Sequence, residues 1–542
     1  MSAHSLHSLH SRCRTGAAVA AVAAGTLVLT ACTVGPNFVR PSPPLSAHWP
    51  AAALAPAAEP APHVPSPAAG GITAEGQPET IPPLSRVTEG GADLASWWMR
   101  FNDPQLTSLI ERALRANLDL RVAILRTQEA LEQRSIDTGG SYPNFSANAS
   151  YQLENISEST PEGSLLTAVP KFSIPGVGHV SIPNPYSQYQ LGASASWELD
   201  LFGRLRRTSE AANASAQVSI EDQRSVRVSL LEQVAQSYLA LRGAQARRAV
   251  ALQDVQTIQQ LLQLTQQRRA AGLTTEIDVR NALAQLSQTR ATLPALDLSI
   301  SQSIHALGNL LGEQPEALRA ELARSAPIPP VPPRIPIGLP AQLVRRRPDI
   351  REAEANLHAA TAQIGVAIAD LFPRLTLSGA GGLQSDTAAN LLNWKSLFGN
   401  VGPQLDIPVF DRGAWHTVPL YRLRAREAAL TYQSTVLSAL HQVEDAMAAY
   451  NADQQQRQWL TDTVTQNGIA LQLARDRYAS GLTDFLDVLD ALRTLQQNQM
   501  SLLASTTAVS TDLVALYRAL GGGWGAPAAV SAARAERPVS FR

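Results

Sequence analysis

The chain has 542 residues, and its 44 Lys and Arg nearly balance its 45 Asp and Glu, giving a formal net charge of −1. Because there is no basic surplus, nucleic acid is excluded as a predicted partner. Charged residues make up only 16% of the chain, which suits long helices that pack on more than one face. No run of eighteen apolar residues follows the N-terminal region, so any membrane insertion is expected to use strands.

The N-terminus predicts export and a lipid anchor. An apolar run from Gly16 to Leu29 follows His and Arg residues and predicts a signal peptide over residues 1–31. The run ends in Leu-Thr-Ala-Cys at residues 29–32, which resembles a bacterial lipobox, so we expect cleavage before Cys32 and acylation of its sulfur. The alternative is an ordinary signal peptide followed by a chance cysteine. Thr33 resembles the residue found in lipoproteins sorted to the outer membrane, and the lipid would anchor the chain without spanning.

Residues 32–92 are rich in Pro, Ala and Gly and predict an extended tether without a core of its own. Helices are expected over residues 93–140. One of them should begin at Asp103-Pro104, with Asp103 as N-cap and Pro104 in the first turn.

The strongest signal is an internal repeat, in which one motif recurs 209 positions later without a gap. The matching positions are Gly272-Leu273-Thr274, Asp278-Val279, Ala282-Leu283 and Leu311-Gly312, then Gly481-Leu482-Thr483, Asp487-Val488, Ala491-Leu492 and Leu520-Gly521. Upstream, Tyr142 is echoed by Phe372 at an offset of 230, and Leu199-Asp200 by Leu405-Asp406 at 206. The first copy therefore carries a longer loop, which we place between Asn155 and Tyr186.

Each copy contains two segments of strict apolar–polar alternation, which predict a β-hairpin over residues 141–202 and another over 372–412. The apolar positions are Phe145, Ala147, Ala149, Tyr151 and Leu153; Tyr189, Leu191, Ala193, Ala195, Trp197 and Leu199; Leu375, Leu377 and Leu383; and Val401, Leu405, Ile407 and Val409. In a soluble sandwich the apolar face would point inward. If the strands span a membrane instead, four cannot close a barrel, and oligomerisation is required. Pro403 in the fourth strand is tolerable at an edge.

A long helical hairpin should follow each β-hairpin, over residues 203–312 and 413–521. Residues 205–271 lack proline, and heptad positions such as Leu231, Tyr238, Val234 and Leu241 are mostly apolar, which indicates coiled-coil packing. A Pro-rich linker over 313–345 and a helix over 346–371 should connect the copies, and residues 522–542 form a tail.

These residues resemble the TolC-like outer-membrane efflux factors, specifically the NodT-type lipoproteins, over nearly the whole mature chain. The motifs that carry the resemblance are Val34-Gly35-Pro36-Asn37-Phe38, Trp97-Trp98, Trp197-Glu198-Leu199-Asp200-Leu201-Phe202-Gly203-Arg204, Arg346-Arg347-Pro348-Asp349-Ile350-Arg351, Leu371-Phe372-Pro373 and Arg477-Tyr478. The resemblance implies a mixed α/β membrane protein. Its trimer would form one twelve-stranded transmembrane β-barrel, continued by a twelve-helix periplasmic α-barrel with an equatorial mixed region.

The resemblance also implies an exit duct of a tripartite efflux system that passes drugs or other small molecules to the exterior. Its partners would be a periplasmic adaptor, an inner-membrane pump of the RND type and outer-membrane lipid. The hairpin turns would dock the adaptor through Arg268, Gly272, Leu273, Thr274, Arg477, Gly481, Leu482 and Thr483. Asp487 and Asp490 match positions at the closed entrance, where three copies would form a carboxylate ring.

A local alternative exists for each of these positions. Gly272 and Gly481 have the residue type that ends helices, and the sequences Thr275–Asp278 and Asp484–Asp487 have the pattern of capping boxes. For Asp278 we favour capping, and for Asp487 and Asp490 the gate.

No catalytic motif, metal-ligand pattern or cofactor motif is present, so the chain is not predicted to be an enzyme, and the lipid on Cys32 is its only expected attached group. A coiled-coil lipoprotein without a pore and a secreted enzyme remain the competing classes. The strand alternation and the repeat argue against the first, and the missing site chemistry against the second. Small-molecule efflux and protein export share one architecture, and the sequence does not separate them.

Overall fold

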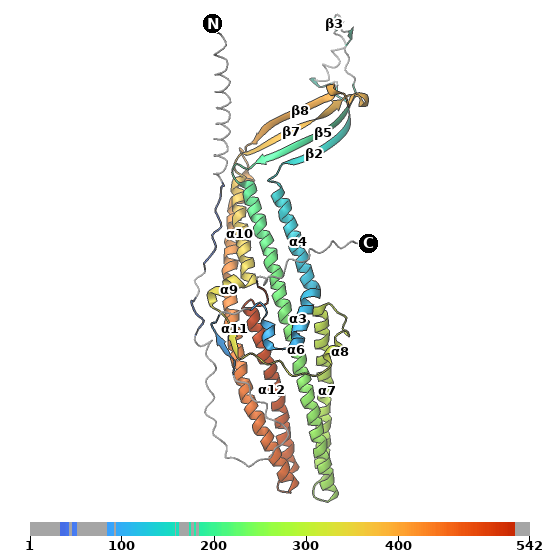
Figure 1. Cartoon of the computed structure of the whole chain (residues 1–542), viewed down its shortest axis with the longest axis vertical. Coiled ribbons are helices and arrows are strands. Elements are labelled where there is room, and N and C mark those ends of the chain that lie inside the picture. Colours follow the sequence, from blue (N-terminus) through green and yellow to red (C-terminus); the bar gives the residue numbers. More distant parts are fainter. Residues whose placement is uncertain are drawn as a thin grey trace, which may run out of the picture. The chain divides into compact units, whose positions relative to one another are not determined.

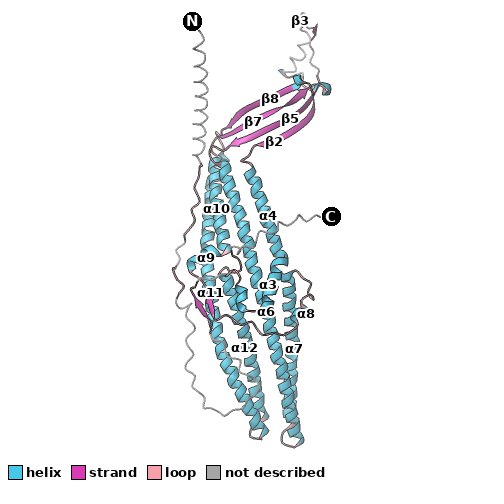
Figure 2. Cartoon of the chain, in the orientation of Figure 1, coloured by secondary structure: helices cyan, strands magenta, loops and turns pink. Residues whose placement is uncertain are grey.

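A computed structural model describes residues 33–42, 46–50, 84–90, 94–157, 159–161, 173–174, 178–179 and 184–525. The predicted signal peptide, Cys32, most of the tether and residues 526–542 lie outside this part of the chain. Contacts divide the chain into two compact units, one within residues 1–40, 130–216 and 355–429, the other within 41–129, 217–354 and 430–542. Figure 2 shows that helices dominate, with the strands gathered mainly in one sheet.

The first unit holds a four-stranded antiparallel sheet made of β2 (Asn144–Glu154), β5 (Tyr186–Leu199), β7 (Arg374–Ser385) and β8 (Leu397–Asp406). The order is β2-β5-β7-β8, as Figure 1 shows, so the central β5–β7 pair joins the two copies of the repeat and β2 and β8 are the edges. Between β2 and β5 lie the short strands β3 (Ser173–Ile174) and β4 (Gly178–His179). Between β7 and β8 lie the 3-10 turns η3 (Ala388–Asn390) and η4 (Trp394–Ser396).

The predicted alternation is confirmed in β2, β5 and β7, where apolar positions face apolar partners: Ala147 pairs with Ala193, and Trp197 with Leu377. The fourth strand is shorter than predicted. It ends at Asp406, so Ile407 and Val409 lie outside the ladder. Pro408 accounts for the difference because it has no N–H to donate. Pro403 lies within β8, which is an edge strand of this chain's sheet, as expected.

Two long helical hairpins follow the strand pairs. The first is α6 (Arg204–Ala270) and α7 (Glu276–Leu311); the second is α11 (Arg412–Ala479) and α12 (Phe485–Ala519). At 1.5 Å per residue, a helix the length of α6 measures roughly 100 Å. The predicted heptad residues Leu231, Val234, Tyr238 and Leu241 are buried, which confirms the seam there. Gly243 allows a close approach to α12, since a Cβ at this position would lie 2.4 Å from Oγ1 of Thr507.

The main core of the second unit includes the residues around the start of the first helices, from Trp97 to Ala113. The 3-10 helix η1 (Trp97–Phe101) buries Trp97, whose ring stacks on Tyr517 at 5.2 Å. The helix α3 (Pro104–Ala116) begins as predicted, because the Asp103 carboxylate accepts from the N–H groups of Gln105 and Leu106. The helix α4 (Leu118–Gly139) follows directly.

The tether prediction is wrong for three short stretches. Residues 34–38 pack within the first unit, and two other stretches pack into the second. Strand β1 (Arg86–Thr88) pairs in parallel with β6 (Arg334–Pro336), and Trp49 is buried, its indole N–H donating to the Gly338 carbonyl at 2.9 Å. One aromatic ring and one buried valine, Val87, fix these stretches, although the composition around them is that of a linker. The linker between the copies also holds the helix α8 (Arg319–Leu322). The helices α9 (Pro340–Arg346) and α10 (Pro348–Ala369) come next.

One helix in the described residues, α12, is long and apolar enough to cross a membrane by length and composition alone. Its apolar side chains have another explanation, since Val509, Leu513 and Tyr517 are fully buried in the core of the second unit. Such a pattern is typical of a core helix.

Candidate functional sites

The two hairpin turns have the same backbone conformation. Gly272 and Gly481 both have φ of +74°, a left-handed conformation that favours glycine. The N–H of Leu273 donates to the Arg268 carbonyl, and the N–H of Leu482 to that of Arg477, each at 2.8 Å. These bonds close each helix with the geometry of a Schellman motif, so Gly272 and Gly481 do end their helices. The side chains of Leu273 and Leu482 are exposed.

Arg268 joins the two turns, a role that the sequence did not indicate. Its Nη1 donates to the Ala479 carbonyl at 2.8 Å, and its guanidinium lies 4.7 Å from the centre of the Tyr478 ring. Tyr478 packs edge-on against Phe485, at the start of α12. Of the two arginines predicted to dock a partner, Arg268 therefore also holds the tips of this chain together, whereas Arg477 is exposed.

The acidic residues after the two turns differ in their surroundings. Burial opposes the ionisation of Asp278, but the Thr274 hydroxyl and the Thr275 N–H donate to its carboxylate and outweigh that effect, so its pKa is lowered. The capping prediction for Asp278 is confirmed. At the second turn the capping alternative is not seen: the Asp484 side chain makes no capping bond, and the Asp487 carboxylate accepts from the Thr483 hydroxyl.

Asp487 and Asp490 lie three residues apart on the exposed side of α12, while the neighbouring Val488 and Leu489 are buried. Residues with this spacing lie on one face of a helix. The arrangement leaves both carboxylates available to interact with a charge outside the chain.

The residues that follow Cys32 are packed within the first unit. Arg207, which is 3% exposed, donates to the carbonyls of Val34 and Gly35 and, at 2.8 Å, to Oδ1 of Asn37. Gly35 passes so close to Gly365 that a Cβ would lie 2.5 Å from the Gly365 Cα. These contacts explain the motif Val34–Phe38. It provides the small residue that fits against Gly365 and the oxygen atoms that accept from Arg207; we call the surface formed by Arg207 and Gly365 the seat of residues 33–38.

A short polar chain extends the same seat. The other side of Arg207 donates to Glu210 at 2.7 Å, and Glu210 lies 2.9 Å from Nε2 of His358. The His358 ring stacks on Phe38 with centroids 4.3 Å apart. Sequence reasoning missed Arg207, Glu210 and His358, because nothing in their spacing relates them to residues 33–38.

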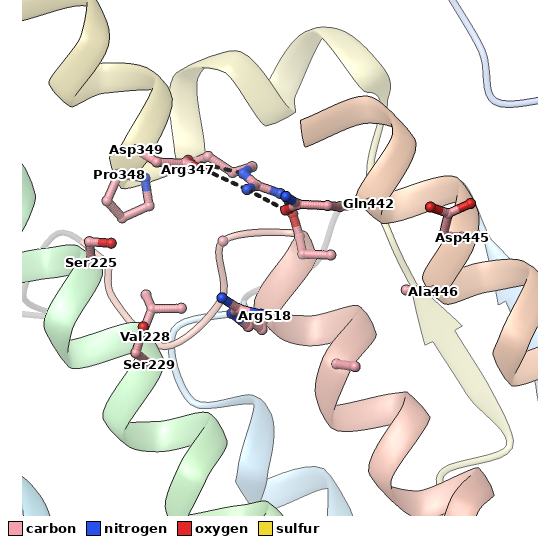
Figure 3. A pocket seen from close by; sticks show the side chains of 13 residues that line it. Ser225, Val228, Ser229, Arg347, Pro348, Asp349, Gln442, Asp445, Ala446 and Arg518 are labelled. Carbon is pink, nitrogen blue, oxygen red and sulfur yellow. Dashed lines mark hydrogen bonds and ion pairs between the residues drawn. The ribbon is translucent and has the colours of Figure 1, made fainter. Parts of the chain in front are cut away.

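The motif at residues 346–351 ties together distant parts of the second unit. Arg347 donates to the Ala519 carbonyl at 2.8 Å and to both oxygens of Asp349, and it reaches Gln442 on α11 (Figure 3). A cavity of about 250 Å³ lies beside these side chains. Because Arg347 closes the C-terminal end of α12, this motif is a structural clamp.

Arg351, from the same motif, binds a second cluster. It shares the fully buried Glu221 with Arg224, at 2.7 and 2.6 Å. The guanidinium groups of both arginines also lie over the Trp524 ring, 5.1 and 4.6 Å from its centre. The C-terminal end of the described chain is therefore fixed to α6 and α10. Among the described residues, no three His, Cys, Asp or Glu side chains group as metal ligands would.

Residues 109–313 and 339–522 match the model of the outer membrane efflux protein family. The chain is 30% identical over 500 residues to outer membrane protein OprJ of Pseudomonas aeruginosa. The aligned region covers 92% of this chain and 94% of OprJ. It is 31% identical over 442 residues to the cation efflux system protein CusC of Escherichia coli O6:H1, covering 79% and 88%. Nodulation protein T of Rhizobium leguminosarum bv. trifolii is 29% identical over 505 residues, covering 92% and 96%.

Solved structures show the same likeness. The outer-membrane channel OprN superposes with a TM-score of 0.77 at 32% identity, over 91% of this chain and all of that one. A crystal structure of CusC superposes with a TM-score of 0.71 at 26% identity, over 91% and 100%. The fold predicted from the repeat and the motifs is therefore the fold of these channels. The chain belongs to the outer membrane efflux protein family and is the outer-membrane channel of an efflux system.

Proposed function

We propose that three copies of this chain assemble into one duct, in which twelve strands close a transmembrane barrel and twelve helices continue it through the periplasm. The observation that carries the proposal is the pair of free edges, β2 and β8, on a sheet of only four strands. An unpaired edge exposes a row of backbone N–H and C=O groups, and in a bilayer each of these must find a partner. Three copies supply the strands for a closed barrel.

Apolar stripes on the helices support assembly as well. Within the second unit, Leu118, Val122 and Leu125 of α4 are exposed at helical spacing, as are Leu430 and Leu437 of α11. Residues three, four or seven apart share one face of a helix. Exposed apolar stripes of this kind are suited to packing against another copy of the chain.

In this assembly the hairpin tips, Arg268–Thr274 and Arg477–Thr483, dock a periplasmic adaptor, which connects the duct to an inner-membrane pump of the RND type. The exposed Leu273 and Leu482 support a docking role. Asp487 and Asp490 of three copies form a carboxylate ring at the closed entrance, which favours cations. The protein acts as a conduit and not as an enzyme.

The N-terminal region provides the second attachment to the membrane. Residues 1–31 are removed as a signal peptide and Cys32 receives lipid, palmitate among its acyl chains. One relative, of Salmonella typhimurium, is named as a probable outer membrane lipoprotein. The seat that binds residues 33–38 supports this assignment, because it fixes the chain directly after the acylated residue.

The transported class is small molecules. Relatives of Pseudomonas putida are named for solvent and toluene efflux, and the Escherichia coli relative for cation efflux. These names favour small-molecule efflux over protein export for this chain.

The test uses the lipidated full-length protein extracted in mild detergent. Native mass spectrometry should give three subunits, each with an acylated Cys32, and the same sample should form ion-conducting channels in a planar bilayer. A stable, membrane-inserted monomer would contradict the trimeric duct.

A further inference from the structure

The connections within the two strand pairs, β2 to β5 and β7 to β8, leave the same end of the sheet (Figure 1). The ladders place Tyr151, Tyr189 and Ser385 side by side near that end. At the opposite end, the four strands lead within a few residues to α4, α6, α10 and α11. Because the helices extend into the periplasm, the connections lie on the side of the outer leaflet. The connection over residues 386–396, here called the β7–β8 connection, is described in full.

Hydrogen bonds give the β7–β8 connection a defined shape. The N–H of Asn393 donates to the Asn390 carbonyl at 2.9 Å, and the Asn393 side chain accepts from the N–H of Lys395 at 3.0 Å. The turn η4 also lies against β7. Despite this order, Leu392 is 79% exposed and Trp394 is 82% exposed. A folded turn that holds two large apolar side chains away from its own chain is suited to an apolar surface outside it.

The position of these two side chains along the sheet indicates which surface that is. They precede the apolar stripe of β8, formed by the exposed Leu397, Val401 and Leu405. In a strand that spans the outer membrane, such a stripe faces the lipid. β8 has 10 residues, and at about 3.3 Å per residue and a tilt near 40° it rises roughly 25 Å, the height of the apolar band. Trp394 therefore lies at the level where the hydrocarbon meets the head groups, which tryptophan favours.

A rare cation stands beside the tryptophan. Lys395 and Lys171 are the only lysines in the chain, and Lys171 falls outside the described residues. The Lys395 side chain is exposed. Asp386, the one acid of the β7–β8 connection, lies at its other end, where it accepts from the Ser385 hydroxyl at 3.4 Å. A lysine at this depth keeps its methylene groups in the apolar layer and extends its ammonium group to the phosphates of the head groups.

We propose that the β7–β8 connection is a lipid-binding site for the outer leaflet. Leu392 and Trp394 insert at the boundary between hydrocarbon and head groups, and Lys395 binds the phosphate of a glycolipid head group. The inference rests on the outer-membrane location of the chain. It is independent of the lipid on Cys32, the docking of an adaptor and the carboxylate ring.

The depth of the connection is measured with a small fluorophore on Leu392→Cys in the lipidated full chain, whose only other predicted cysteine is the acylated Cys32. Asp386→Cys, at an exposed polar position of the same connection, is the matched control. Phosphatidylcholine brominated near its head group should quench the label at 392, and aqueous iodide should quench the label at 386. Quenching of the label at 392 by iodide alone overturns the insertion and favours an extracellular protein as the partner of this surface. Wild-type conductance of both labelled proteins shows that the result concerns the connection and not the duct.

The role of the ring is tested in the protein labelled at 392. Trp394→Ala should weaken quenching by the brominated lipid, because the anchor of the turn is removed. Trp415→Ala, which removes another exposed ring, in α11, is the control and should leave the quenching unchanged. Equal quenching in the two variants overturns the assignment of Trp394.

Acylation of the Lys395 amine tests the phosphate contact. The protein is placed in bilayers of digalactosyldiacylglycerol, which carries no phosphate, and treated with a membrane-impermeant acylating reagent; peptide mass spectrometry then gives the rate at Lys395. Adding lipid A, a phosphorylated glycolipid of outer leaflets, should lower this rate about fivefold. Lipid A stripped of its phosphates, or inorganic phosphate at the same concentration, should not. Equal rates with the two forms of lipid A, or equal protection by inorganic phosphate, overturn the lipid-phosphate site.

Discussion

The two helical hairpins share one motif and one backbone, yet their charges are arranged differently. After the first turn, the Asp278 carboxylate accepts from Thr274 and Thr275 and its pKa is lowered. After the second turn, Asp487 and Asp490 both point to solvent. The repeat therefore duplicates the scaffold, while two exposed carboxylates on one helix face after the turn occur only in the second copy, since Asn281 stands at the position that matches Asp490.

The interior of the second hairpin also differs from the first. Burial, together with the neighbouring Asp453, raises the pKa of Asp512 to about 7. The positions that precede these two acids by 209 residues are Ala244 and Ser303, which carry no charge. At these positions only the second hairpin thus contains a pair of half-buried acids, which is destabilising when both are ionised.

The largest expected effect concerns this pair. Because folding raises the pKa of Asp512 above its usual value of 3.8, the stabilisation is complete below about pH 4 and is lost as the pH rises through about 7. Asp512→Asn should remove most of that dependence, on the order of 2 kcal/mol after allowance for solvent screening. Thermal unfolding at pH 5 and pH 8 checks it, with Ser303→Asn on α7 as the control; an unchanged pH dependence in the Asp512 variant would contradict the assignment.

The two turns should be destabilised equally by a substitution that affects only their shared backbone conformation. Ala at either Gly272 or Gly481 is forced into a left-handed conformation, which costs about 1 to 2 kcal/mol. The space around both positions accepts a Cβ, so the strain alone should decide. Hydrogen exchange at the amides of each tip should accelerate to a similar degree. A large difference between the two variants would show that the tips are not equivalent scaffolds.

Substitutions of Asp278 and Asp487 should have a smaller effect on the stability of the tips, and the effect should differ between the two tips. Asp278→Ala removes a carboxylate that accepts from a backbone N–H and should destabilise the first tip by about 1 kcal/mol. This contribution should be present at neutral pH and disappear as the pH falls through the lowered pKa. Asp487→Ala removes only a contact to the Thr483 hydroxyl and should leave exchange at the second tip nearly unchanged. Equal acceleration at both tips would mean that Asp487 caps its helix as well.

Local periodicity predicted most of this fold. The alternation identified β2, β5 and β7. The first helix hairpin followed from the absence of proline over residues 205–271, and the second followed from the repeated turn motif at Gly481, although α11 contains Pro419. The burial of Trp49 and the end of β8 before Pro408 depend on single residues, and composition averages over these.

The site residues also fall into two groups, those that the sequence predicted and those that it did not. The turns were found because their motif is repeated in the sequence. The bonds of Arg268 to Ala479 and of Arg207 to residues 34–37 join positions at least 170 residues apart, and no local pattern encodes such contacts.

The most direct test of the central claim, that the second hairpin carries the gate and the first does not, is single-channel conductance in a planar bilayer. Asp487→Ala combined with Asp490→Ala should raise the conductance and reduce the preference for cations, because a ring of carboxylates is removed. Asp278→Ala is the matched control and should leave both quantities at the wild-type values. Unchanged conductance and selectivity in the double variant, or the same change in the Asp278 variant, would contradict the account.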